Sequence, residues 1–321
     1  MKLLIVITSY RAKELTLDCL RSLVGEVREN PGVRVGICDN GNEDDTLEYL
    51  TGAIAERGWQ EWAYVTHVVP NRGFAGGNNV ILRDALDSGE DYDYYLLLNA
   101  DTIMRPGALR RLIDGIESED GIGIACPRLE WPDGEPQISC FRFISPISEF
   151  IAAAQTAPLT RLLGRWRVPL TASDVPVEMD WGSFACALIK KEVLEKIGVL
   201  DEGYFLYFDD VDYCRSARND GWKVKYFPQS RVVHLRGKSN PLKERAAKRQ
   251  RRPAYWYQSR SWYLKKFYGT PGLFAANMLW YAGRLVSFLR EAIGNKKPHV
   301  CEHEWQDIWT GFTGRSSFRQ E

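Results

Sequence analysis

The chain has 321 residues, of which 45% are hydrophobic and 26% charged, and its 42 basic and 42 acidic side chains cancel. This composition excludes a disordered or fibrous chain, and the zero net charge disfavours a globally basic nucleic-acid binder. The charge is unevenly spread, because residues 236–266 hold eleven Lys or Arg and only one acid, Glu244. The rest of the chain must therefore carry a net negative charge.

The sequence shows no targeting segment. The N-terminal apolar run has no small-residue cleavage site before the charged residues 11–14, so we interpret it as a buried strand. The uncharged stretch 267–283 contains a proline and three glycines, and it is shorter than the roughly 20 apolar residues that span a bilayer. The seven cysteines are scattered without a CxxC pair, which is typical of reduced thiols in a cytoplasmic protein.

The first 126 residues alternate between apolar runs and segments of helical spacing. The pattern predicts strands over 3–8, 33–38, 63–69, 94–98 and 122–126, and helices over 15–27, 44–57, 76–86 and 107–116. Strands that alternate with helices at this spacing indicate an α/β protein with a parallel, doubly wound sheet. Such sheets bind ligands at the carboxyl ends of their strands. Those ends fall at residues 8–10, 39–40, 71–79 and 99–101.

The pattern is weaker between residues 127 and 179, where we expect loops, short strands and a surface helix. Order then returns. We expect an apolar run over 185–189, helices over 192–197 and 210–219, an aromatic strand over 204–208, and strands over 224–227 and 232–235.

Two motifs near the predicted strand ends have alternative interpretations. Asp39 precedes Asn40 and Gly41, so it is either a turn residue or a carboxylate that accepts hydrogen bonds from a base and a ribose. The glycine-rich segment 71–79 is either a turn into a helix or a backbone that a phosphate or ribose approaches closely. Its spacing is not GxGxxG, and residues 8–11 contain no glycine, which argues against a nicotinamide dehydrogenase.

Acidic residues and one histidine form the remaining motifs. Asp101 is either a strand-end cap or a ligand of a divalent ion that is shared with phosphate oxygens. Asp209, Asp210 and Asp212 suit a helix N-terminus, but like charges this close cost energy unless something compensates them. We therefore favour a catalytic carboxylate among them. His234 is either a structural residue or the group that completes a metal site with Asp101.

Taken in order, these segments resemble the family-2 inverting glycosyltransferases with the GT-A fold, and most of all their bacterial rhamnosyltransferase-type branch. The resemblance covers roughly residues 3–266. Its seven motifs lie at 7–10, 38–40, 71–79, 97–101, 181–185 and 208–212, and at His234 with Gly237 and Ser239. It implies a Rossmann-like catalytic domain over 1–240 and a mostly helical C-terminal region over 241–321. The nucleotide-binding half would span about 1–126 and the acceptor-binding half about 127–240.

The resemblance implies which residues bind a nucleotide-diphosphate sugar, linked to dTDP or UDP. Asp39 would hold the pyrimidine base of this donor. The other implied donor-binding residues are Thr8, Tyr10, Glu14, Asn71, Gly73, Gly76, Asn79 and Asn99.

The resemblance also implies a metal and a base. Asp101 matches the last residue of the DXD motif and would bind Mg²⁺ or Mn²⁺ together with His234, with Asn99 in place of the first acid of the motif. Asp210 occupies the general-base position. Asp209 would contact the acceptor, and Trp181 and Gly182 would line the pocket for the sugar and the acceptor.

The implied reaction moves a sugar such as rhamnose to a hydroxyl of a glycan or lipid-linked acceptor, with inversion, in cell-surface polysaccharide assembly. Two alternatives stay open. A nucleotidyltransferase should carry a Gly-rich loop with Arg and Lys after the first strand, which residues 8–11 do not supply. An inactive nucleotide-sugar-binding or scaffold protein would tolerate the loss of Asp101, Asp210 or His234, and all three are present.

The C-terminal region combines a basic run at 243–252 with aromatic residues between 255 and 268. This combination suits an anionic membrane surface, with an amphipathic helix over 273–293 lying against lipid or protein. We therefore expect a location in the cytoplasm, peripheral on the inner face of the membrane. Nucleic acid is a less favoured partner. Alternatively, the aromatic residues pack on the catalytic domain or on a second subunit, which would make a homo-oligomer.

Overall fold

A computed structural model describes residues 1–236 and 242–314, and the side chains of 242–244 are left out. Gly237 and Ser239 of the His234 motif, and Lys243 and Glu244 of the basic stretch, therefore lie outside the described side chains. The chain forms two compact units. The first comprises Met1–Phe141, Thr171–Glu202 and Asp209–Ser239. The second comprises Arg142–Leu170, Gly203–Phe208 and Asn240–Glu321.

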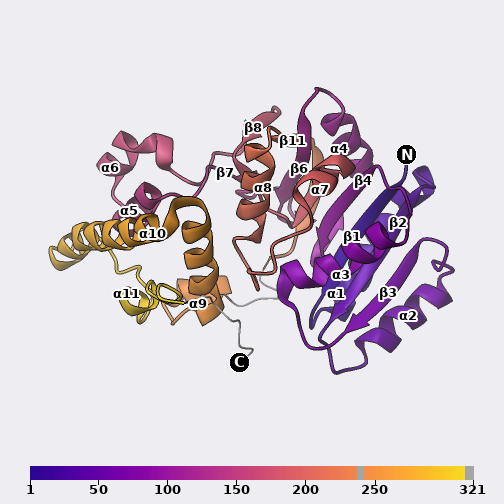
Figure 1. Ribbon diagram of the computed structural model, residues 1–321, viewed down its shortest axis with the longest axis horizontal. Helices are drawn as coiled ribbons and strands as arrows, with labels where there is room; N and C mark the ends of the chain where they lie inside the picture. The colour runs from indigo at the N-terminus through magenta and orange to yellow at the C-terminus, as the bar shows by residue number, and fades with distance from the viewer. Residues whose placement is uncertain (237–241, 315–321) are drawn as a thin grey trace. The chain divides into compact units, whose positions relative to one another are not determined.

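The first unit is built on a nine-stranded sheet with the strand order β3-β2-β1-β4-β10-β6-β11-β5, and β8 pairs with β11 (Figure 1). The strands are β1 (Leu3–Ser9), β2 (Val33–Asn40), β3 (Ala63–Val68), β4 (Tyr94–Asn99), β5 (Thr102–Met104), β6 (Ile122–Glu130), β8 (Val177–Met179), β10 (Cys186–Lys190) and β11 (Lys223–His234). A separate antiparallel pair joins β7 (Cys140–Phe141) to β9 (Trp181–Gly182).

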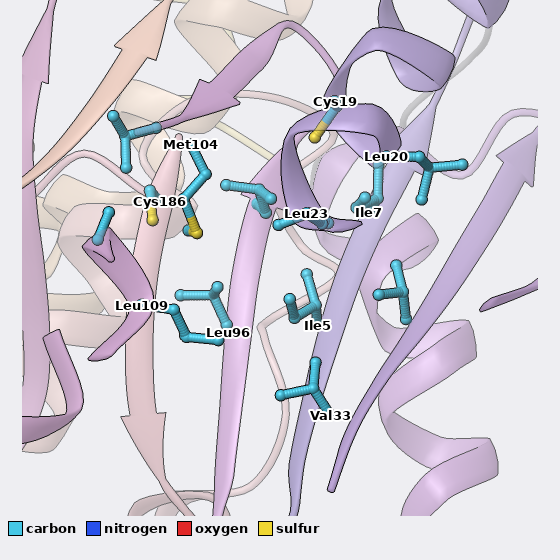
Figure 2. Packing of buried hydrophobic residues seen from close by; sticks show 14 of the residues in the cluster. Ile5, Ile7, Cys19, Leu20, Leu23, Val33, Leu96, Met104, Leu109 and Cys186 are labelled. Carbon is cyan, nitrogen blue, oxygen red and sulfur yellow. The ribbon is translucent and has the colours of Figure 1, made fainter. Parts of the chain in front are cut away.

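Six helices accompany these strands. They are α1 (Lys13–Glu29), α2 (Thr46–Glu56), α3 (Gly73–Asp87), α4 (Ala108–Ile116), α7 (Lys191–Ile197) and α8 (Asp209–Asn219). The core lies between sheet and helices, where Leu20 and Leu23 of α1 and Leu109 of α4 join Ile5 and Leu96 of the strands in one buried cluster (Figure 2). The strands β1 and β4 are continuous apolar runs because both faces of this part of the sheet are buried.

The five strands and four helices predicted for the first 126 residues are all present, and β3, β2, β1 and β4 pair in parallel as expected. The complete sheet is mixed, because β10, from outside the first 126 residues, inserts antiparallel between β4 and β6. Residues 204–208 do not form the expected strand, since Tyr207 and Phe208 have left-handed φ angles of 68° and 69°. The two strands expected over 224–235 are one strand, β11, with an irregularity between Phe227 and Arg231.

The second unit is helical, as the resemblance implies for the C-terminal region. It contains α5 (Pro146–Ala154), α6 (Ala157–Leu162), a short 3₁₀ helix (Gly164–Trp166), α9 (Leu242–Ala247), α10 (Ala254–Ala292) and α11 (Glu304–Asp307). Gly269 has a left-handed φ of 70° and divides α10 into two helices. Arg260 is fully buried and forms an ion pair of 2.7 Å with Glu149 of α5. Among the residues that the structure describes, no helix is long and apolar enough to span a membrane.

Candidate active site

The carboxyl ends of β1, β2, β3 and β4 bring predicted site residues to one edge of the sheet. The register pairs Ser9 with Asp39, and Asp39 with His67. On the other side of β1, Thr8 pairs with Asn99. Parallel pairing aligns the strand ends, so polar residues that follow separate apolar runs become neighbours.

Asp39 is buried with a partner on each carboxylate oxygen. The side-chain amide of Asn42 donates to Oδ1, and Nδ1 of His67 lies 2.7 Å from Oδ2. The same amide of Asn42 also donates to the Ser9 carbonyl at 3.2 Å. Sequence reasoning missed Asn42 and His67. The strand-end rule placed the end of the strand predicted over 63–69 at residues 71–79, whereas β3 ends at Val68, so the last residues of the strand itself would have been the signal for His67.

Thr8, Tyr10 and Glu14 lie where β1 leads into α1. Thr8 and Tyr10 are half-buried, and Glu14 is exposed in the first turn of α1. The Oγ1 atom of Thr8 is buried and has no hydrogen-bond partner among the described residues. A buried hydroxyl without a partner costs free energy, so a ligand that bonds to it would gain affinity. Arg11 donates its backbone N–H to Asn42 Oδ1 at 2.7 Å, which ties this turn to Asp39 through Asn42.

The glycine-rich segment 71–79 is held tightly against β2. The amide of Asn40 donates to Asn71 Oδ1 at 3.1 Å and to the Gly73 carbonyl at 2.9 Å. Gly73 is buried with a left-handed φ of 70°, and Gly76 is buried where a Cβ would lie 2.6 Å from Cβ of Arg72. These glycines are therefore required by backbone geometry and close packing.

Asn79 is fully buried and connects α3 to residues 200–202. Its Nδ2 donates to the Leu200 carbonyl at 2.8 Å and to Glu202 Oε1 at 2.9 Å, and its Oδ1 accepts from the Leu200 N–H at 3.0 Å. These hydrogen bonds engage both the nitrogen and the oxygen of its amide. Asn79 thus positions the segment 200–202 rather than presenting its own amide.

The structure brings together the two predicted metal ligands. The strands β5 and β11 pair so that Thr102 faces His234, and the Leu235 N–H donates to the Asp101 carbonyl at 2.9 Å. As a result, Nε2 of His234 lies 3.3 Å from Oδ1 of Asp101, and both side chains are buried.

This pair fits a divalent ion as part of a larger ligand set. Two ligands at right angles, each about 2.1 Å from an ion, lie about 3 Å apart, close to the observed separation. Within the described residues no group of three or more His, Cys, Asp or Glu side chains could hold a metal. Diphosphate oxygens and water would have to complete the coordination, which is usual for magnesium bound with a nucleotide.

Arg236 is a third residue that sequence reasoning missed, although it opens the basic stretch 236–266. Its guanidinium donates to the Ile138 carbonyl at 2.9 Å, and its buried Nε has no partner among the described residues. Burial lowers the pKa of this guanidinium, whereas the charge of Asp101 acts in the opposite direction. A cation near the Asp101–His234 pair is suited to a diphosphate.

Asp210 lies at the N-terminus of α8, where free N–H groups stabilise a negative charge. It is half-buried and accepts a hydrogen bond of 2.9 Å from the Val211 N–H. Burial raises its pKa to about 7, while the N–H groups of Val211 and Phe184 act in the opposite direction. Its neighbours Asp209 and Asp212 are buried.

The segment that contains Phe184 links Asp210 to the metal-binding pair. The Ala185 carbonyl accepts the N–H of Asn99, a half-buried residue two positions before Asp101, at 2.9 Å. The N–H of the preceding residue, Phe184, faces Asp210. Residues from 99–101, 184–185 and 209–212 thus form one continuous neighbourhood in the first unit.

Trp181 and Gly182 form β9, which packs against α8. Trp181 is half-buried, and its ring stacks on Phe141 with centroids 4.1 Å apart. Gly182 is buried, and a Cβ there would lie 2.6 Å from Sγ of Cys126. Gly182 therefore permits the close packing of β9.

This arrangement is that of a GT-A glycosyltransferase fold: a mixed α/β sheet with polar residues at the carboxyl ends of its strands, an Asp–His pair at the adjoining strand ends and an acidic helix N-terminus. The model of the family described as "Glycosyltransferase like family 2" matches residues 2–255, and the chain belongs to this family.

Curated relatives match about half of the chain. An N-acetylglucosaminyl-diphospho-decaprenol L-rhamnosyltransferase of Mycobacterium tuberculosis is 29% identical over 160 residues, which are 48% of this chain and 51% of the relative. The hexosyltransferase Agl10 of low-salt glycan biosynthesis in Haloferax volcanii is 29% identical over 154 residues (48% and 46%). Rhamnosyltransferase WbbL of Escherichia coli is 24% identical over 165 residues (50% and 60%). The chain thus spans about half the length of the curated relatives it matches.

Solved structures share the fold at low sequence identity. The mannosyltransferase PcManGT of Pyrobaculum calidifontis, in complex with GDP-Man and Mn²⁺, matches with a TM-score of 0.56 and 13% identity, over 98% of this chain and 85% of that one. GalNAc-T7 with UDP, GalNAc and Mn²⁺ matches with a TM-score of 0.59 and 14% identity, over 97% and 57%.

Proposed function

We propose that the protein is an inverting glycosyltransferase that moves a sugar from a nucleotide-diphosphate donor to a hydroxyl of a glycan or lipid-linked acceptor. The observation that carries the proposal is the neighbourhood of Asp101, His234 and Asp210. It combines a pair of groups suited to a divalent ion with a carboxylate at a helix N-terminus, linked through residues 184–185. Nucleotide-sugar transfer needs both parts: neutralisation of a leaving diphosphate and removal of a proton from the acceptor.

In the proposed reaction, Asp210 takes the proton from the acceptor hydroxyl. The oxygen then forms a bond to the anomeric carbon on the face opposite the nucleotide, and the bond to the diphosphate breaks with inversion. A pKa of about 7 suits a general base at neutral pH, because a substantial fraction is ionised and yet basic enough to hold the proton. A divalent ion, when bound by Asp101 and His234, would supply positive charge for the leaving diphosphate. Arg236 adds a permanent positive charge nearby.

The relatives support the choice of substrates. The relatives from M. tuberculosis and E. coli are named rhamnosyltransferases, so rhamnose is our leading candidate for the sugar. The M. tuberculosis name specifies a diphospho-decaprenol acceptor, which favours a lipid-linked acceptor and a role in cell-surface polysaccharide assembly. We propose a dTDP- or UDP-linked donor, with its pyrimidine held at Asp39. Seven cysteines without a disulfide favour the cytoplasm as the place of the reaction.

A transfer assay tests this function. The full chain is incubated with dTDP-rhamnose, UDP-sugars or GDP-mannose, a lipid-diphosphate-sugar acceptor, and Mg²⁺ or Mn²⁺. We expect transfer from one pyrimidine-linked donor, and the product's anomeric configuration, read by NMR, should be opposite to that of the donor. Donor binding without transfer to any acceptor would favour a scaffold protein. Retention of configuration would contradict Asp210 as the base of a single displacement.

A further inference from the structure

The second half of α10, residues 270–292, has one buried and one exposed face. The buried face packs against α5, which lies beside α10 in Figure 1. A Cβ at Gly283 would lie 2.4 Å from the Phe150 carbonyl. The opposite face carries large apolar side chains at helical spacing, each between 38% and 70% exposed. They are Phe274, Met278, Leu285, Phe288 and Leu289, followed by Ile293 at the end of the helix. We call these six residues the α10 apolar stripe.

The segment that carries the stripe and the segment that packs on α10 through α5 are both rich in basic residues. Residues 142–170 and 271–300, all of them described by the structure, contain eight Arg or Lys and two acids. Both acids are neutralised within the unit: Glu149 pairs with the buried Arg260 at 2.7 Å, and Glu291 pairs with Arg284 at 2.8 Å. The basic residues are Arg142, Arg161, Arg165, Arg167, Arg284, Arg290, Lys296 and Lys297.

Hydrogen bonds bring the basic residues of these two segments together. Arg290 donates to the Gln155 carbonyl at 3.1 Å, and Lys296 donates to Gln155 Oε1 at 2.9 Å, so the end of α10 lies beside the start of α6. Arg161, Arg165 and Lys297 are exposed residues of the same two segments. The exposed apolar stripe is therefore bordered by basic residues. Both acids of segments 142–170 and 271–300 are already in ion pairs.

Some of the aromatic residues that the sequence favoured for a membrane surface are buried inside the second unit, and two residues of the basic run form ion pairs there. Tyr257 and Tyr263 are fully buried, and Trp256 stacks edge-on to Phe208. In the basic run, Arg251 pairs with Asp307 at 2.8 Å and Arg252 with Glu304 at 2.9 Å. These aromatic residues thus pack within the second unit, whereas the basic side chains at 245, 248 and 249 stay exposed.

We propose that the α10 apolar stripe is a docking surface for an anionic phospholipid bilayer. The stripe would enter the headgroup–acyl boundary, while the surrounding Arg and Lys side chains contact lipid phosphates. Charge complementarity selects this partner over a second copy of the chain, because a two-fold contact through the stripe would place the same cations against one another. This docking is independent of the proposed transferase reaction, since it needs neither donor nor divalent ion.

Vesicle co-sedimentation of the full chain tests this surface. We expect binding to vesicles that contain phosphatidylglycerol, little binding to pure phosphatidylcholine, and weaker binding at high salt. The triple variant Leu285→Asn, Phe288→Asn, Leu289→Asn should bind at least roughly tenfold more weakly, because it removes apolar contact area. The double variant Lys296→Gln, Lys297→Gln should lose about fivefold per lysine on anionic vesicles only.

A matched control keeps the test independent of general surface hydrophobicity. Leu86→Asn with Val175→Asn changes exposed apolar residues of the first unit and should bind as the wild type does. Wild-type binding by the triple variant, or no wild-type binding at low salt, would overturn the proposal. A third result would also overturn the proposal: the wild type binds no vesicles and is a dimer in analytical ultracentrifugation, whereas the triple variant is a monomer. The stripe would then be covered by a second copy of the chain.

Discussion

His67 Nδ1 lies 2.7 Å from Oδ2 of Asp39, and the two residues are register partners at the ends of β3 and β2. Asp39 is buried, whereas the His67 side chain is 35% exposed, so the imidazole lies between the carboxylate and solvent. With Asn42 on the other oxygen, His67 fixes the carboxylate that we propose for base recognition.

We expect His67→Phe to weaken donor binding about tenfold, because a buried carboxylate that loses a hydrogen-bond donor is costly to keep ionised and oriented. The turnover number at saturating donor should change little, since His67 does not touch the reacting atoms in the proposed mechanism. Isothermal titration of donor and product nucleotide measures the effect. His303→Gln, at an exposed histidine of the second unit, is the control. Unchanged affinity in a folded His67→Phe protein would contradict this role.

Asp210→Asn should reduce transfer roughly 10²-fold or more, because it keeps the shape of the side chain and removes its basicity. Donor affinity should stay near that of the wild type. In the wild type, the rate with subsaturating acceptor should rise as the pH increases through about 7, where Asp210 loses its proton, and the variant should lack this rise.

Two variants control the assignment of the base. Asp220→Asn, an exposed residue that follows the other end of α8, should be active. If Asp209→Asn abolished transfer while Asp210→Asn did not, the base would be Asp209.

Asp210 should also make folding stability depend on pH. Its pKa is about 7 in the folded protein against an ordinary value of 3.8, so between these values the folded state holds a proton that the unfolded state has released. Stability from this group is therefore present at low pH and is lost as the pH rises toward about 7. We expect Asp210→Asn to unfold at a higher temperature than the wild type at about pH 8 and at a similar temperature at about pH 4. A difference that is the same at both pH values would argue against the raised pKa.

Removing either member of the Asp101–His234 pair should remove the metal dependence of donor binding. We expect the wild type to bind the nucleotide-diphosphate sugar about tenfold more tightly with Mg²⁺ or Mn²⁺ than with excess chelator. Asp101→Asn and His234→Gln should show nearly the same affinity in both conditions. Calorimetric titration measures the donor affinity with the metal and with the chelator, and thermal unfolding verifies that each variant is folded. Full wild-type affinity and activity in excess chelator would refute a metal role for the pair.

The sequence by itself determined the elements whose signal is local. Continuous apolar runs such as 3–8 and 94–98 identified strands buried on both faces, and helical spacing identified α1 and α4, so the α/β class followed from short-range patterns. Polar residues placed directly after such runs made Asp39 and Asp101 candidates, with a turn or a cap as the alternative. The resemblance, and not the local pattern, gave these residues and Asp210 their roles, which stay predictions.

Only the tertiary structure decided which of these ends meet. The antiparallel β10, the pairing of β5 with β11 and the Asp39–His67 contact depend on register between segments far apart in the sequence, which no local pattern encodes. Contacts between distant segments also decide which residues of the C-terminal region are buried and which are exposed. Composition identified its basic and aromatic residues, but packing decided that Tyr257, Tyr263 and Arg260 are buried while the α10 apolar stripe stays exposed. Burial is a property of the neighbours that the fold supplies, and not of the residue type alone.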